Sequence, residues 1–146
     1  MQDVDDQTVA YVLDAQTYFE DLKQVAAQLA GFIVLQASGS KSAAPDHPML
    51  AAAEQVHKNA ADGLRSARVA ARVRTHHDHL LEASARLDTA LLAIRGGGDA
   101  LPSLERTWAE LRSASRTLPG FQTISFERGC CAEAHRPNGP LCAGGK

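Results

Sequence analysis

Apolar and small residues recur at alternating steps of three and four in the first part of the chain. This spacing places them on one face of an α-helix. The face runs over three repeats through Val12, Ala15, Phe19, Leu22, Ala26, Leu29 and Ile33. Ser38 and Gly39 follow it, and glycine just beyond the last periodic residue commonly ends a helix. The pattern therefore predicts a long first helix that ends near residue 38.

A second periodic region follows a loop at 39–48, where glycine, serine and two prolines interrupt the pattern. It runs from Pro48 to Arg95. The first half repeats at Leu50, Ala53, His57, Ala60, Leu64, Ala67 and Ala71, and the second at Val73, His77, Leu80, Ser84, Leu87, Leu91 and Ile94. The step from Ala71 to Val73 fits neither register, which implies a stutter, a kink or a change of packing partner. Gly63 is a second weak point in this helix.

A third helix is expected after the glycines at 96–98. Asp99 is a suitable N-cap and Pro102 suits the first turn. The apolar positions are Leu101, Leu104, Trp108, Leu111, Ser115 and Leu118. Pro119 and Gly120 end the pattern.

The predicted fold is all-α: an antiparallel bundle of three long heptad-patterned helices, with the second continuous, kinked or broken. Residues 1–120 would form the bundle, and 121–146 a short extended segment followed by a tail that contains all the cysteines. A continuous second helix would be roughly 70 Å long and the first roughly 45 Å. Apolar flanks would then stay exposed. We expect either a homodimer of coiled-coil type that covers them, which is slightly favoured, or a break near Gly63 that gives a compact four-helix bundle.

Composition narrows the classes of partner. The net charge is −2, so no global charge attracts nucleic acid or an anionic membrane. The acidic start lacks the basic region of a signal peptide, and no apolar run approaches about 18 residues. We expect a cytoplasmic protein without a membrane segment.

The tail carries the first candidate chemistry. Cys130, Cys131, His135 and Cys142 offer three sulfurs and one imidazole, a ligand set suited to zinc or copper. The spacing is not a standard one, because side chains of adjacent residues in an extended chain point apart. The alternatives are incidental thiols, or a reactive Cys130–Cys131 pair whose thiol pKa is lowered by Arg128.

A second candidate is a di-metal site inside the bundle. Glu54 and His57 have the Glu-x-x-His spacing that di-iron carboxylate bundles use, and Glu20 is a third candidate ligand. A bundle site needs two such pairs and this chain has one, so a dimer would have to supply the other half. Alternatively, His57 forms a hydrogen bond across the core.

A histidine cluster and a stripe of basic residues are the remaining candidate sites. His76, His79 and Glu82 share a helix face beside His77, where they would form a metal site or a pH-sensitive contact, or be surface residues. Basic residues form a stripe at Lys58, Arg65, Arg68, Arg72 and Arg74. No aromatic residues interleave for base stacking, so the stripe is expected to face the acidic first helix rather than nucleic acid.

No phosphate-binding loop, nucleophile elbow or metalloprotease motif occurs in the sequence. Two tyrosines and one tryptophan offer little aromatic material for a ligand pocket. The expected function is therefore a non-enzymatic interaction or regulatory module that binds through an apolar helical face. The leading alternative is a metal-binding or metal-sensing protein that uses the tail.

Overall fold

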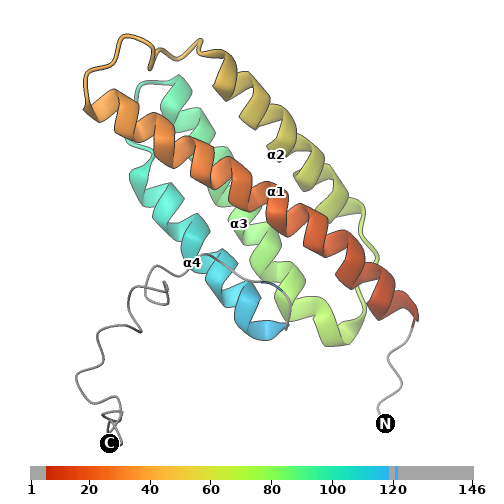
Figure 1. The fold of residues 1–146 in the computed structure, drawn as a ribbon. Helices are drawn as coiled ribbons and strands as arrows, with labels where there is room; N and C mark the ends of the chain where they lie inside the picture. Colours follow the sequence, from red (N-terminus) through yellow and green to blue (C-terminus); the bar gives the residue numbers. More distant parts are fainter. Residues whose placement is uncertain (1–5, 119–120, 122–146) are drawn as a thin grey trace, which may run out of the picture.

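The computed structural model describes residues 6–118 and residue 121. Within this part of the chain it has four α-helices and one short 3₁₀-helix (Figure 1). The helices are α1 (Asp6–Ala37), α2 (Pro48–Ser66), η1 (Ala71–Val73), α3 (Arg74–Arg95) and α4 (Leu101–Thr117). The described part is therefore all-helical, as the sequence predicts.

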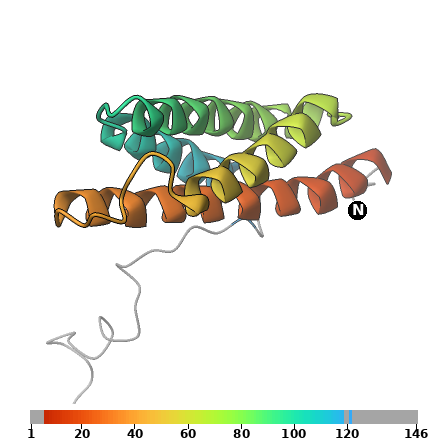
Figure 2. The ribbon, with the colours of Figure 1, turned by 90° about the horizontal axis from the view of Figure 1, so that it is seen from above.

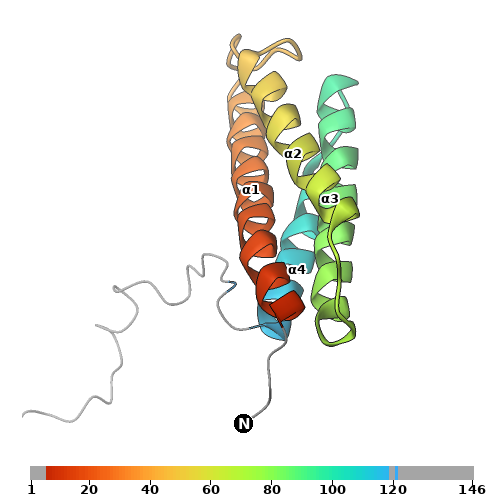
Figure 3. The same cartoon turned by 90° about the vertical axis from the view of Figure 1, so that its right-hand side faces the viewer.

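Consecutive helices run antiparallel and pack as two hairpins. α1 pairs with α2 and α3 pairs with α4, while α1 also packs against both α3 and α4. Figure 2 shows α1 along one side of the molecule, and the other described helices all lie on the same side of α1. Figure 3 shows α2 crossing between α1 and α3. Short connections favour such antiparallel neighbours in helical bundles.

The periodic residues of the first helix form the centre of the core. Phe19, Leu22 and Leu29 are fully buried, and Val12 and Ile33 at the ends of the pattern are partly buried. Phe32 is also buried. The helix stops at Ala37, and Gly39 adopts a φ of 72° in the turn that follows. Both the predicted face and the predicted end are confirmed.

The expectation of three long helices is corrected. The predicted second helix is two helices, α2 and α3, separated by residues 67–73, so the alternative with a break describes the chain. The break lies a few residues beyond Gly63, at the predicted phase shift. Ala67 and Ala70 have extended backbone, with ψ of 139° and 152°. Because the chain turns back there, Val73 enters the core at 1% exposure and α3 returns along α2.

The last helix is rotated relative to the sequence prediction. Leu101 is 46% exposed, whereas Leu104, Thr107, Leu111 and Ala114 face the core. Asp99 accepts a hydrogen bond from the Leu101 amide at 3.0 Å, as expected of a residue that caps the helix start. Phe121 is 3% exposed and packs edge-on against Phe19, with ring centroids 5.3 Å apart. The core thus includes a residue just past the predicted boundary at 120.

None of the helices in residues 6–118 combines the length and apolar character that a membrane crossing requires. The predicted extended segment beyond Phe121 and the cysteine tail lie outside the described residues.

Candidate functional site

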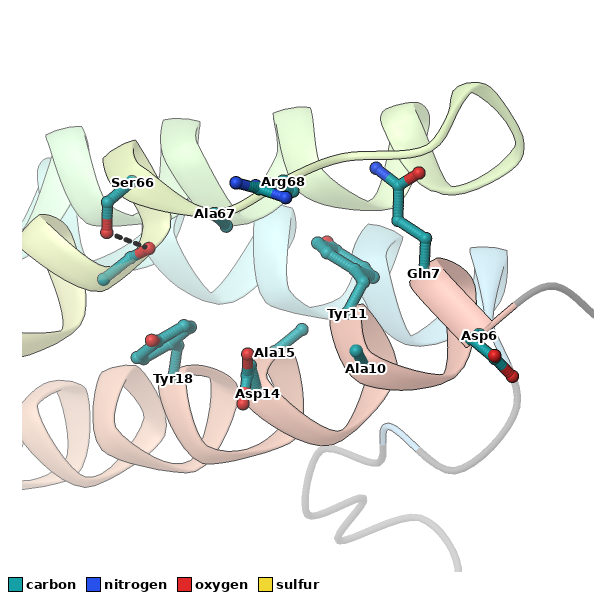
Figure 4. A pocket seen from close by; sticks show the side chains of 11 residues that line it. Asp6, Gln7, Ala10, Tyr11, Asp14, Ala15, Tyr18, Ser66, Ala67 and Arg68 are labelled. Carbon is teal, nitrogen blue, oxygen red and sulfur yellow. Dashed lines mark hydrogen bonds between the residues drawn. The ribbon is translucent and has the colours of Figure 1, made fainter.

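A groove of about 560 Å³ lies between the first half of α1 and the end of α2 (Figure 4). Its α1 side includes Tyr11, Asp14 and Tyr18, and its other side is formed by the end of α2 and the extended segment with Arg68. We call it the tyrosine groove. No local sequence pattern indicates a pocket here, because only the fold brings the two tyrosines and Arg68 to one groove.

Gly63 allows Tyr18 to lie close against α2. A Cβ atom at position 63 would fall 2.3 Å from two carbon atoms of the Tyr18 ring, so any larger residue would move that ring. Tyr18 and Gly63 both line the groove. The predicted weak point of the second helix is thus a position of close helix–helix approach, and the chain breaks further on.

Beneath the groove, Tyr11 forms a buried hydrogen bond with His76 of α3. The Tyr11 hydroxyl is 2.9 Å from His76 Nδ1, and the two residues are 3% and 1% exposed. Phe121 covers the His76 ring, with centroids 4.3 Å apart. His77, 7% exposed, also contacts the Tyr11 ring edge-on. This buried group, Tyr11, His76, His77 and Phe121, joins α1, α3 and the residue beyond α4.

The two histidines of this group are neutral near pH 7. Burial, together with the neighbouring His77 and His79, lowers the pKa of His76 to about 4. Burial also lowers the pKa of His77 and raises that of Tyr11. His76 Nε2 and His77 Nδ1 are buried without a hydrogen-bond partner in the described part of the chain. Such orphaned groups carry a desolvation cost of about 1–3 kcal/mol each.

Two smaller hollows of about 360 and 270 Å³ adjoin between α2 and α3 and share His57, Arg65 and Asp88. His57 Nε2 lies 2.8 Å from the Ser84 carbonyl oxygen and 3.2 Å from its hydroxyl. A carbonyl oxygen can only accept, so Nε2 donates to it. His57 therefore faces the core and bonds across it, as one of the two sequence interpretations expected.

The proposed ligands of a bundle metal site have separate partners. Glu54 binds Arg95 through two hydrogen bonds of 2.7 and 2.8 Å, which hold the pKa of its carboxyl below the usual range. Glu20 pairs with Lys23 at 3.1 Å. Among residues 6–118 and 121, no three His, Cys, Asp or Glu side chains are grouped to hold a metal ion. The structure thus does not bring Glu20, Glu54 and His57 together as a ligand set.

The residues predicted to form a histidine cluster, His76, His79 and Glu82, each have a different partner. His79 Nδ1 is 2.7 Å from Glu110 of α4, and Glu82 pairs with Arg86 one turn later. His76 instead contacts Tyr11 on α1. The three residues thus contribute to three different contacts.

The basic stripe does not pair with the acidic first helix. Arg65 pairs with Asp62 of its own helix at 3.0 Å. Arg68 lines the tyrosine groove opposite the aspartates of α1, and within the described residues no ion pair joins the two sides. The candidate metal ligands Cys130, Cys131, His135 and Cys142 lie outside the described residues, and that site stays a prediction.

One further surface is the side of α1 that faces away from the core. Val9, Leu13 and Val34 on this side are 46%, 63% and 67% exposed. Val9 and Leu13 are one turn apart, and Val34 follows Leu13 by close to six turns of 3.6 residues. We call this surface the outer face of α1.

Comparison with protein-family models, curated proteins and solved structures gives no match for this chain.

Proposed function

We propose that this protein is a homodimeric interaction module that self-associates through the outer face of α1. The observation that supports the proposal is the exposure of three large apolar side chains, Val9, Leu13 and Val34, on this one side of α1. None of the other described helices lies on this side of α1, and Figure 2 shows α1 along one side of the molecule. α1 has 32 residues and is the longest described helix, so it offers a continuous surface roughly 48 Å long.

The order of side chains along this face suits a second copy in the antiparallel direction. With the two-fold axis at the level of residues 21–22, Val9 lies beside Val34 of the partner subunit. Leu13 is then level with Ala30 of the partner subunit and next to Gly31 of the partner subunit, where a Cβ would meet nothing within 4 Å. The large Leu13 side chain then meets small residues, while Val9 and Val34 form an apolar contact at each end of the face. A two-fold axis repeats each contact and closes the assembly at a dimer.

Charge favours the same arrangement. Glu20 and Lys23 form an ion pair within α1 on either side of residues 21–22. The antiparallel copy would place Lys23 of the partner subunit next to Glu20, so that opposite charges alternate across the axis. A parallel pair would instead align Glu20 with Glu20 of the partner subunit. Like charges that face one another disfavour the wrong arrangement.

Sedimentation velocity of the full chain tests the proposal. We expect a dimer at about 100 μM, with dissociation on dilution, because one helical face forms a modest interface. Leu13→Glu places a charge in the apolar contact and should give a monomer. Leu92→Glu is the matched control, because Leu92 is 65% exposed on α3 and lies outside the face.

A wild-type monomer at that concentration would refute self-association. Equal effects of Leu13→Glu and Leu92→Glu would refute the assignment to α1. Circular dichroism of each variant shows whether the helices are kept, which separates loss of the interface from loss of the fold.

A further inference from the structure

We propose that the tyrosine groove binds a small zwitterion of amino-acid or dipeptide size. This inference does not depend on self-association, because the groove lies between α1 and α2 and not on the outer face of α1. Its volume of about 560 Å³ lies within the range of small-molecule sites. The groove also brings together the only two tyrosines of the chain.

The two sides of the groove carry opposite charges. Asp14 lies on the α1 side, and Arg68 extends over the groove from the segment after α2 (Figure 4). Neither side chain has an ion-pair partner within the described residues. A purely anionic ligand would be repelled by Asp14, and a purely cationic ligand would be repelled by Arg68. A ligand with one cationic and one anionic group satisfies both sides.

Two tyrosine rings also line the groove. Tyr11 is held by its hydrogen bond to His76, so its ring is fixed in place. Tyr18 lies across Gly63 at the other end of the groove (Figure 4). Tyr11 is 3% exposed, so the ring that a ligand can cover is that of the partly buried Tyr18, where an ammonium group gains about 0.5–1 kcal/mol. Asp14 projects from α1 between the two tyrosines in the sequence, so the cationic group of the ligand belongs on this side.

The helix break forms the opposite side. Residues 67–70 are not helical, and Ala67 and Ala70 have extended backbone, so Arg68 projects from this segment rather than from a continuing helix. A guanidinium group binds a carboxylate through two parallel hydrogen bonds, which fixes its orientation. The carboxylate of the ligand is therefore assigned to Arg68. Residues 67–73 thus both reverse the chain and supply the anion-binding group.

The test uses protein-detected NMR with a panel of probes. The probes are leucine, methionine and phenylalanine, their glycyl dipeptides, and the N-acetyl and C-amide form of each. At least one zwitterion is expected to shift the resonances of Tyr11, Tyr18 and Arg68. Its N-acetyl and C-amide forms, which each lack one charge, should bind roughly fivefold more weakly, as expected of exposed charge pairs.

Variants assign each charge to one side. In Asp14→Asn the zwitterion and its N-acetyl form should bind equally, and in Arg68→Gln the zwitterion and its C-amide form should bind equally. Asp88→Asn and Arg65→Gln change the same charges in the hollows between α2 and α3, and should leave the affinities unchanged.

Three results would overturn the proposal. They are no shift with any probe, equal binding of charged and blocked forms to the wild type, and equal effects of groove and control variants. Repeating the titration with Leu13→Glu separates this site from self-association, because the zwitterion should still bind to that variant.

Discussion

His76 and its hydrogen bond to Tyr11 determine how the core responds to acid. The pKa of His76 is about 4 in the folded chain and near 6.5 when unfolded, so the unfolded state binds the proton more readily. The stability that depends on neutral His76 is fully present above pH 6.5 and is lost as the pH falls toward 4. The loss amounts to about 3 kcal/mol, from about 1.4 kcal/mol per pKa unit.

Urea denaturation at pH 4 to 7 measures this loss. The matched variant is Tyr11→Phe/His76→Leu, which replaces both hydrogen-bonded partners with apolar groups and leaves neither orphaned. Its stability should decline less than that of the wild type over the same pH range. Parallel curves for the two proteins would contradict the assignment to His76.

Gly63→Ala tests the close approach of Tyr18. Alanine gains up to about 1 kcal/mol over glycine within a helix, while the new Cβ displaces the Tyr18 ring. The two effects oppose each other, so the free energy of unfolding should change by less than about 1 kcal/mol. The NMR signals of Tyr18 should move, and the zwitterion should bind more weakly. Gly31→Ala, at a position with open space, is the control for helix propensity.

At the scale of single residues, the sequence predicts what depends on periodicity and misses what depends on distant contacts. His57 falls on the apolar face of its helix, and the structure buries it. His76 falls off the predicted face of α3 and yet is 1% exposed. Its partner Tyr11 is 65 residues away in the sequence, and no local pattern connects the two.

At the scale of the helices, the ion pair between Arg95 and Glu54 links the end of α3 to the first half of α2. The Arg95 guanidinium binds both carboxylate oxygens of Glu54 and also donates to the Pro45 carbonyl in the preceding loop. Both Arg95→Gln and Glu54→Gln should destabilise the fold slightly, because the pair is partly exposed to solvent. A double-mutant cycle by urea denaturation should give a favourable coupling that weakens in high salt.

The pH dependence of this coupling follows from Glu54. Hydrogen bonding to Arg95 lowers the pKa of its carboxyl in the folded state. The coupling should therefore be fully present above the usual carboxyl pKa, and it should be lost as the pH falls from there through the lowered pKa of Glu54 in the folded state. A coupling that is the same in acid and at neutral pH would mean that the ion pair does not contribute.

The helix break shows why the number of elements was harder to predict than their apolar faces. Residues 67–73 contain no glycine or proline, and alanine and arginine favour a helix. The local sequence thus favours one continuous helix, whereas the change of heptad register between Ala71 and Val73 favours a break. Burial of Val73 and the return of α3 onto α2 outweigh local propensity, and this balance depends on the whole bundle.

At the scale of the whole molecule, the bundle needs Phe121 to complete its core. The ring packs between Phe19 of α1 and His76 of α3 and is 3% exposed. Chains that end at residues 120 and 128 differ at this point, because only the longer one keeps Phe121. Loss of a buried phenylalanine side chain removes about 3 kcal/mol or more of stability. The chain ending at 128 should unfold near the wild-type urea concentration, and the chain ending at 120 well below it.

Phe121→Ala in the full chain makes the same change without truncation and should lower stability by a similar amount. It should also lessen the dependence of stability on pH, because water then reaches the His76 ring and the desolvation that lowers its pKa is smaller. Reduced stability with the same dependence of stability on pH as the wild type would mean that Phe121 contributes packing alone. His76 would then stay shielded from water without it. A chain ending at 120 that is as stable as the wild type would place the boundary of the bundle where the sequence predicted it.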